Sequence, residues 1–314
     1  MEKITTIGLD IAKNVFQVHA ISKNGDVILR KALRRKQMIT FFDKLPPCLI
    51  GMEACATAHH WARTLIASGH DVKLIPPAYV KPYLRRQKND AADAAAICEA
   101  VTRPTMRFVP VKSEEQQATL MLHTARDLLV SQRTALIDAI RGHFAEFGMV
   151  VPQGARNVHL LIAIIHEKDN DDLNASARTA LLPLATALLD IDVQIIKLGK
   201  AILTAHRNNE MSVRLETIPG IGPIIASSLS ASIPDVSLFK CGREFAAYLG
   251  LVPRQHSTGG KPRLGRITKM GNRRLRKLLV VGACAALYAI KSGKTNTPIG
   301  EWARSLLAKS LLNW

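Results

Sequence analysis

Thr5-Thr6-Ile7-Gly8-Leu9-Asp10-Ile11-Ala12-Lys13 gives the strongest indication of fold in this chain. Its apolar and β-branched residues predict a buried strand, and it carries one carboxylate, Asp10, near its end. A strand that ends in an acid can hold a catalytic charge on a rigid element. A lone aspartate more often starts a turn, so Asp10 indicates a site only if other acids accompany it.

Three other acids stand at the ends of predicted elements. Glu53 comes directly after an apolar run at residues 48–52, and Asp90 and Asp93 precede or begin an alanine-rich helix predicted at residues 91–101. Because Asp90 and Asp93 are three residues apart, they lie on one helical face and can point at the same ion. Either Asn89 or Asp90 could instead be only the N-cap of that helix.

The first 104 residues predict an α/β domain. The expected strands cover residues 4–9, 15–21, 27–32, 48–52 and 71–75, and the expected helices cover residues 38–45, 59–67 and 91–101. Asn24-Gly25 is typical of a hairpin turn, and Pro46-Pro47 ends the first helix. The resulting order, βββαβαβα, is that of the ribonuclease-H-like (RuvC-like) fold. In that fold, acids on the first strand, the fourth strand and the last helix converge.

Residues 105–210 predict a long helical region. The apolar spacing indicates one helix at residues 114–147 and another at residues 177–206, separated by a weakly patterned stretch at residues 152–175. The acidic residues 169–172 suggest a solvated loop. Two long helices of similar length favour an antiparallel hairpin or a coiled-coil dimer arm, although an ordinary helical bundle fits the same pattern.

The composition predicts a polyanionic partner and argues against a secreted or membrane-spanning protein. The chain has 314 residues and a net charge of +18, with 43 Lys and Arg against 25 Asp and Glu, which predicts a polyanionic partner. Its five cysteines have no metal-ligand spacing and indicate reduced thiols in the cytoplasm. No signal-peptide pattern is visible, and the longest apolar run, residues 278–290, is too short to span a bilayer. We therefore expect a cytoplasmic, nucleoid-associated protein with no membrane partner.

Residues 211–314 predict a mainly helical third domain, with helices at residues 224–231, 245–251 and 275–290. The turn Ile218-Pro219-Gly220-Ile221-Gly222-Pro223 resembles the hairpin of a helix-hairpin-helix element, where backbone N–H groups cradle a phosphate. A plain tight turn explains the same short pattern. Between Lys240 and Lys277 there are eleven Lys and Arg and one acid, Glu244, so this segment carries +10 of the net charge. A run this unbalanced predicts a phosphate-contacting surface.

The candidate nucleic-acid contacts combine this third domain with the basic residues just before Asp90. They are Arg85, Arg86, Lys88, Gly220, Gly222, Arg254, Lys261, Arg263, Arg266, Lys269, Arg273 and Arg274.

Ser257 stands within the basic segment, in Pro253-Arg254-Gln255-His256-Ser257-Thr258-Gly259-Gly260-Lys261. A serine in such a loop is ordinarily a turn former. Its neighbours Arg254, His256 and Lys261 could also activate a hydroxyl and hold a phosphate, which makes Ser257 a candidate nucleophile.

Four carboxylates drawn together would repel one another, so Asp10, Glu53, Asp90 and Asp93 predict a cation site. Oxygen ligands with few nitrogens or thiols favour Mg²⁺ or Mn²⁺. Paired ions at such a site could polarise a scissile phosphate and stabilise the attacking and leaving oxygens.

Six stretches together resemble the DEDD insertion-sequence transposases, which are relatives of the pilin-gene invertases. Members of this transposase family act as bridge-RNA-guided serine recombinases. The stretches are residues 7–13 (IGLDIAK), 52–54 (MEA), 89–94 (NDAADA), 133–148 (RTALIDAIRGHFAEFG), 218–222 (IPGIG) and 253–271 (PRQHSTGGKPRLGRITKMG). Because they span nearly the whole chain in the right order, the match is much more specific than any one motif.

The resemblance implies a DNA transposase, or site-specific recombinase. Asp10, Glu53, Asp90 and Asp93 would be its metal-binding tetrad, and Ser257 would be the nucleophile that becomes covalently joined to DNA. The implied partners are DNA, a structured guide RNA and further copies of the chain in a homodimer or tetramer. The sequence departs from the family at Thr258, where relatives often have Ser or Gly. The resemblance also predicts a final helical segment, and this sequence stops at Trp314, short of it. A shortened or frameshifted copy would account for that difference.

Three other interpretations stay open on the sequence alone. A RuvC-like Holliday-junction resolvase or nuclease would hydrolyse phosphodiesters with water, and Ser257 would then be structural. An ATPase of the actin and sugar-kinase type also begins with a Gly-x-Asp strand, but the chain shows no second Asp-Gly-Gly phosphate motif. A non-catalytic nucleic-acid adaptor would tolerate the loss of all four acids.

Overall fold

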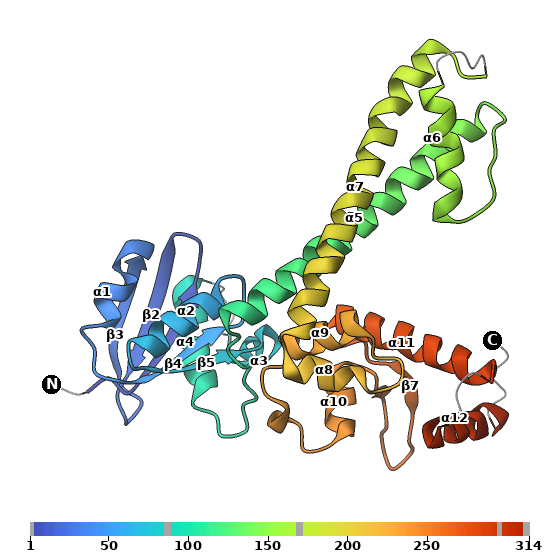
Figure 1. The fold of residues 1–314 in the computed structure, drawn as a ribbon. Helices are drawn as coiled ribbons and strands as arrows, with labels where there is room; N and C mark the ends of the chain where they lie inside the picture. The colour runs from blue at the N-terminus through green and yellow to red at the C-terminus, as the bar shows by residue number, and fades with distance from the viewer. Residues whose placement is uncertain (1–2, 85–88, 168–171, 294–296, 310–314) are drawn as a thin grey trace. The chain divides into compact units, whose positions relative to one another are not determined.

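The computed structural model describes residues 3–84, 89–167, 172–293 and 297–309 (Figure 1). The chain divides into two compact units, Met1–Glu114 with Ile233–Val236, and Glu115–Ser232 with Ser237–Trp314. The division into domains at residues 1–104, 105–210 and 211–314 stays a prediction. Three candidate contacts, Arg85, Arg86 and Lys88, and most of the acidic stretch at residues 169–172 lie outside the described residues.

The first unit is built on a five-stranded mixed sheet. Its strands are β1 (Thr6–Ile11), β2 (Val15–Ile21), β3 (Val27–Arg34), β4 (Leu49–Glu53) and β5 (Asp71–Ile75), in the order β3-β2-β1-β4-β5. The central strand β1 pairs antiparallel with β2 and parallel with β4. The strand predictions are therefore confirmed, with ends that shift by two residues or fewer.

Helices cover both faces of this sheet. α1 (Met38–Phe42) and α2 (Ala58–Ala67) pack on one face, where they share the main hydrophobic core with Ile7 and Leu9 of β1. α4 (Asp90–Val101) packs on the other face. A short helix that the sequence did not predict, α3 (Pro77–Val80), precedes α4.

The alternation of side chains along β1 decides which residues meet which layer. Ile7 and Leu9 are fully buried on the face of α1 and α2. Because successive side chains of a strand point to opposite faces, Gly8 and Asp10 face α4. The acid of the first strand is therefore directed at the helix that carries Asp90 and Asp93.

The second unit contains the two long helices expected from the sequence. α5 (Glu114–Ala145) and α7 (Ala175–Arg207) form an antiparallel hairpin, in which Arg133 of α5 contacts Asp192 of α7 at 3.4 Å (Figure 1). The far end of the hairpin shares a hydrophobic core with α6 (Val158–His166), a helix that the weak pattern at residues 152–175 did not reveal. The use of this hairpin as a dimer arm stays a prediction.

α7 also has the length and composition of a membrane-spanning helix. This is a weak indication, because the core helix of a water-soluble protein passes the same test. The longest uninterrupted apolar run in the sequence, residues 278–290, lies outside α7. Polar residues such as Asp190 and Asp192 interrupt α7, so it has no long uninterrupted apolar run although its mean hydropathy is high.

The remainder of the second unit is mainly helical. Its elements are α8 (Glu210–Glu216), α9 (Pro223–Ser232), α10 (Gly242–Tyr248), β6 (Pro253–Gln255), β7 (Leu264–Ile267), α11 (Arg273–Lys291) and α12 (Pro298–Lys309). β6 and β7 pair antiparallel as a short ribbon inside the segment that the sequence analysis read as a loop. Strands of three and four residues rich in glycine and charge give no recognisable alternation.

Candidate metal centre and serine loop

Gly8 of β1 allows α4 to lie very close to the sheet. A Cβ atom at Gly8 would come 2.1 Å from the carbonyl oxygen of Ala94 and 2.4 Å from the nitrogen of Cys98. On β4, a Cβ atom at Gly51 would come 2.7 Å from the Cβ of Val101. These two glycines set the spacing between α4 and the sheet, and with it the spacing between the first turn of α4 and the end of β1.

The carboxylates of Asp10, Asp90 and Asp93 converge at this close approach. One oxygen from each lies within 4.8 Å of the others, in a group where Asp10 and Asp93 are half-buried and Asp90 is exposed. The N-cap of α4 is Asn89, whose Oδ1 accepts a hydrogen bond from the N–H of Ala92 at 2.7 Å. The alternative in which Asp90 is only the helix cap is therefore wrong.

Glu53, the fourth predicted acid, ends β4 beside β1 and is not part of the group of three. Its charge nevertheless reaches Asp10. The pKa of Asp10 is raised to about 6, first by burial and then by the charges of Asp93, Asp90 and Glu53. A divalent cation would relieve this repulsion, and the oxygen-only donor set suits a hard ion such as Mg²⁺ or Mn²⁺.

Cys55 is a neighbour of this site that the sequence analysis did not single out. The pKa of its thiol is raised by partial burial and then by the charges of Glu53 and Asp10. Its position two residues after Glu53 was the only available signal. A soft thiol is a poor ligand for Mg²⁺, so Cys55 does not add to the donor set.

Ser257 lies beyond the end of β6, in the turn of the β6–β7 ribbon. Its Oγ accepts hydrogen bonds from the backbone N–H of Arg263 at 2.9 Å and from Nε2 of Gln255 at 3.1 Å. The N–H of His256 donates to the carbonyl of Arg263 at 2.8 Å, so the ribbon holds the serine from both sides. Both bonds to Oγ are accepted by its oxygen, which leaves the hydroxyl proton available to another group. Gln255 was missed by the sequence analysis because side-chain direction along so short a strand cannot be read from spacing.

Most of the predicted phosphate contacts are exposed side chains. They are Arg254, Lys261, Arg263, Arg266, Lys269 and Arg273. Arg274 is instead half-buried, and its guanidinium contacts the carboxylate of Asp127 on α5 at 2.8 Å.

The glycine turn before α9 contains two different glycines. Gly220 has a φ of 85°, and a Cβ atom there would come 2.6 Å from the carbonyl oxygen of Gly282 on α11. Gly222 is exposed, and a Cβ atom there would meet nothing within 4 Å. Packing therefore explains Gly220, whereas Gly222 stands at an accessible helix start.

A mixed α/β sheet with converging carboxylates, joined to a basic helical unit, is typical of metal-dependent enzymes that act on nucleic acids. Comparison with known proteins narrows this class. A family profile described as "Transposase", of the DEDD type, matches residues 7–149, and the profile "Transposase IS116/IS110/IS902 family" matches residues 212–297.

Whole-chain relatives agree with these profiles. The chain is 46% identical over 309 residues to the "Putative transposase y4pF/y4sB" of Sinorhizobium fredii, covering 98% of this chain and 79% of the relative. It is 45% identical over 311 residues to the "Probable family 20 transposase" of Pseudomonas aeruginosa, covering 99% and 91%. It is 38% identical over 309 residues to the "Transposase for insertion sequence element IS1328" of Yersinia enterocolitica, covering 98% and 91%.

The chain therefore belongs to the IS116/IS110/IS902 family of insertion-sequence transposases, which are DNA-recombining enzymes. The resemblance to the pilin-gene invertases is also confirmed. The chain is 24% identical over 267 residues to the "Pilin gene-inverting protein" of Moraxella bovis, covering 81% of this chain and 74% of that protein.

Proposed function

We propose that this transposase recombines DNA through a covalent serine intermediate, with Mg²⁺ held by Asp10, Glu53, Asp90 and Asp93. The observation that carries the proposal is the convergence of three of these acids within 4.8 Å. The strand order β3-β2-β1-β4-β5 supports a ribonuclease-H-like fold for this unit. When bound, the metal would neutralise the carboxylates and polarise the oxygens of the scissile phosphate.

Ser257 is the proposed nucleophile. Its Oγ forms a bond to phosphorus, the bond from phosphorus to the deoxyribose oxygen breaks, and the leaving oxygen gains a proton in place of the one that the serine gives up. The N–H donors of Gln255 and Arg263 stabilise the negative charge that develops on Oγ as its proton leaves. The serine ester conserves the energy of the phosphodiester, so strands can be rejoined without ATP, whereas attack by water would lose that energy.

The proposal requires the acids of the first unit and Ser257 of the second to act on the same phosphate. This can occur within one chain or between subunits of a homodimer or tetramer. The exposed cations of the β6–β7 ribbon are the proposed contacts for DNA and for a structured guide RNA, because neutralised phosphates release counterions. We place this activity in the cytoplasm, at the nucleoid.

A covalent trapping experiment tests the serine step. Purified protein, Mg²⁺, the RNA that copurifies with it and DNA carrying the element's ends are mixed and then denatured. We expect an adduct that survives denaturation and that peptide mass spectrometry maps to Ser257. Ser257→Ala forms no adduct, while the matched control Thr258→Ala, which loses the neighbouring hydroxyl, still forms it.

The opposite result identifies the rival mechanism. If the double variant Ser257→Ala/Thr258→Ala recombines DNA at the wild-type rate, no serine ester is needed. Metal-dependent hydrolysis of the Holliday-junction-resolvase type would then be the better account.

A further inference from the structure

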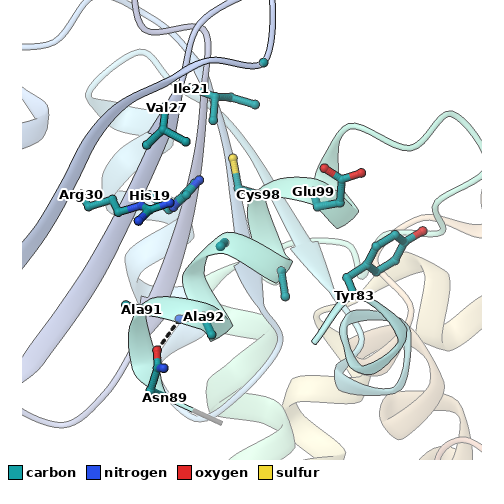
Figure 2. Close-up of a pocket in the computed structure, with 13 residues that line it drawn as sticks. His19, Ile21, Val27, Arg30, Tyr83, Asn89, Ala91, Ala92, Cys98 and Glu99 are labelled. Carbon is teal, nitrogen blue, oxygen red and sulfur yellow. Dashed lines mark hydrogen bonds between the residues drawn. The ribbon is translucent and has the colours of Figure 1, made fainter. Parts of the chain in front are cut away.

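A cavity of about 800 Å³ lies between α4 and the β2–β3 hairpin, on the face of the sheet that also carries Asp10 (Figure 2). Figure 2 shows His19 of β2 and Arg30 of β3 together on one side of this cavity. The facing surface of α4 consists mainly of small side chains, including Ala91, Ala92 and Ala95. Asn89 and Glu99 also line the helix side, so the cavity has a cation and a histidine on the sheet side and mainly small apolar side chains between two polar ones on the helix side.

His19 is the most informative residue of the cavity. The residue is only 7% exposed, it lines the cavity, and no described residue forms a hydrogen bond with its ring. Burial and then the charge of Arg30 lower its pKa, so at neutral pH the ring offers one N–H donor and one acceptor nitrogen. Because the ring borders the cavity, these nitrogens are available to a ligand that carries its own donor or acceptor edge.

Arg30 supplies the charge. It is the direct cross-strand partner of His19, its side chain is exposed, and no acid among the described residues forms an ion pair with it. A guanidinium in this position fits a phosphate group, which it can contact through two parallel N–H bonds. Apolar side chains of Ile21 and Val27 continue the sheet side of the cavity. A ligand with an anionic group, a flat body and a hydrogen-bonding edge matches this set, and a nucleotide has all three.

The pairing register places the cavity next to the candidate metal centre. Asp10 pairs with Gln17, and Gly8 pairs with His19, so Gln17 and His19 share the face of the sheet that carries Asp10. Two residues of a strand span about 7 Å, roughly the offset between Asp10 and His19 along the sheet. A strand of nucleic acid that passes the carboxylates can therefore place an adjacent nucleotide in the cavity.

We propose that this cavity binds one unstacked nucleotide of a nucleic-acid strand, with Arg30 on its phosphate and His19 on the edge of its base. The proposal rests on the nucleic-acid chemistry proposed above for the carboxylates, but binding in the cavity can be measured without metal or reaction. Bases leave a stack at modest cost when the strand is already single, so the site would favour an unpaired nucleotide.

Nuclear magnetic resonance of the full-length protein tests the proposal directly. The histidines are labelled at Cε1, the His19 signal is assigned with His19→Gln, and metal is removed with a chelator. The probes are dAMP, dCMP, dGMP, dTMP, AMP and inorganic phosphate, added separately. We expect a saturable shift of the His19 signal with at least one nucleotide and not with phosphate alone. The comparison of dAMP with AMP shows whether the cavity prefers a deoxyribose or a ribose.

Matched variants identify the contacts. Arg30→Ala should weaken nucleotide binding about tenfold, the scale of one lost charge-assisted hydrogen bond. Lys31→Ala is the control, because Lys31 is the next cation on β3 and its amine lies over the ring of Phe41, in the core on the opposite face. Ala95→Phe should fill the cavity and abolish the shift. Its folding is checked by thermal melting, and Arg30→Ala, on an exposed side chain, serves if Ala95→Phe does not fold.

Each result decides the proposal. A His19 signal that no nucleotide moves, a shift equally produced by inorganic phosphate, or equal effects of Arg30→Ala and Lys31→Ala would each overturn it. Ser257→Ala should keep the nucleotide shift, which separates this proposal from the serine mechanism. If wild-type protein forms the serine adduct but shows no His19 shift, the cavity proposal fails alone. If the shift occurs and no adduct forms, the serine mechanism fails alone.

Discussion

The carboxylate cluster and the Ser257 ribbon hold their reactive groups in opposite ways. Asp10 stands on the central strand of a buried sheet, and two glycines fix the helix that faces it. Every residue of β6 and β7 is exposed, and Ser257 is held by two hydrogen bonds within the ribbon itself. The cluster is therefore positioned by packing, whereas the ribbon is held by its own hydrogen bonds. The two should respond to different kinds of mutation.

The largest effect is expected at the carboxylates. Asp10→Asn should fold but slow strand exchange by about a hundred- to a thousandfold, the scale of losing one preorganised electrostatic group from a transition state. Asp138→Asn, which alters an exposed acid of α5, is the control and should leave the rate unchanged. Single-turnover recombination with purified protein measures both. Wild-type activity in Asp10→Asn would remove the metal centre from the mechanism.

The next largest effect compares a glycine that is packed against α4 with a glycine in the exposed ribbon. Gly8→Ala should reduce the free energy of unfolding by about 3 kcal/mol or more, because its Cβ would overlap the backbone of α4. Gly259 in the ribbon has a positive φ of 54°, which an alanine rarely adopts, but an added Cβ there would have no neighbour within 4 Å. We therefore expect a cost of only about 1 kcal/mol there. Urea unfolding measures both variants, and equal losses would show that α4 is not seated by Gly8.

Residue patterns predicted the parts of this fold that depend on local order. The alternation around Asp10 and the turn chemistry of Asn24-Gly25 located the first strands, and apolar spacing located α5 and α7. Patterns could not choose between Asn89 and Asp90 as the helix cap, because that choice depends on backbone angles. They also could not show that Gly8 seats α4, because the partner lies more than eighty residues along the chain.

The ribbon was harder to predict for a different physical reason. Its strands are too short for an alternation pattern, and the pairing of Gln255 with Ser257 depends on which way one side chain turns. The cavity beside the ring of His19 likewise depends on the position of α4. Such contacts between distant or flexible groups have no periodic signature in a sequence.

A third effect concerns the charge of the ribbon. Replacing Arg263, Arg266 and Lys269 together with alanine should weaken binding to every duplex sequence. If each cation touches one phosphate, the slope of log K against log salt should flatten by about 2.7 in total. Fluorescence anisotropy at a series of salt concentrations measures this slope. The control replaces Lys23, Lys36 and Lys44, three exposed cations of the first unit, and should leave the slope unchanged. Equal flattening in both triple variants would mean that the ribbon is only a solvated basic surface.

A smaller effect is expected at Gln255. Gln255→Ala removes one of the two donors to the Ser257 oxygen and should slow adduct formation about five- to tenfold. The other donor is a backbone N–H, so a substitution at Arg263 keeps it. The duplex affinity of Gln255→Ala should not change, because the side chain carries no charge. If Gln255→Ala lost duplex affinity as well as its rate of adduct formation, Gln255 would support the ribbon as a whole.

The smallest effect is a pH dependence that should occur at the carboxylates and not at the ribbon. The pKa of Asp10 is raised from 3.8 to about 6, so folding favours the protonated acid. In metal-free protein, this group's contribution to stability is fully present below pH 3.8 and is lost as the pH rises through 6. Asp10→Asn cannot lose a proton, so its melting temperature should exceed that of the wild type by a few degrees at pH 8 and match it near pH 4. Mg²⁺ should remove this difference at pH 8 by stabilising the wild type more than the variant, because ligand binding to the folded state raises its stability. Ser257→Ala should follow the wild-type curve at every pH. If the Asp10→Asn and wild-type curves stay parallel from pH 4 to pH 8, the acids do not repel one another in solution, and the argument that they require a cation fails.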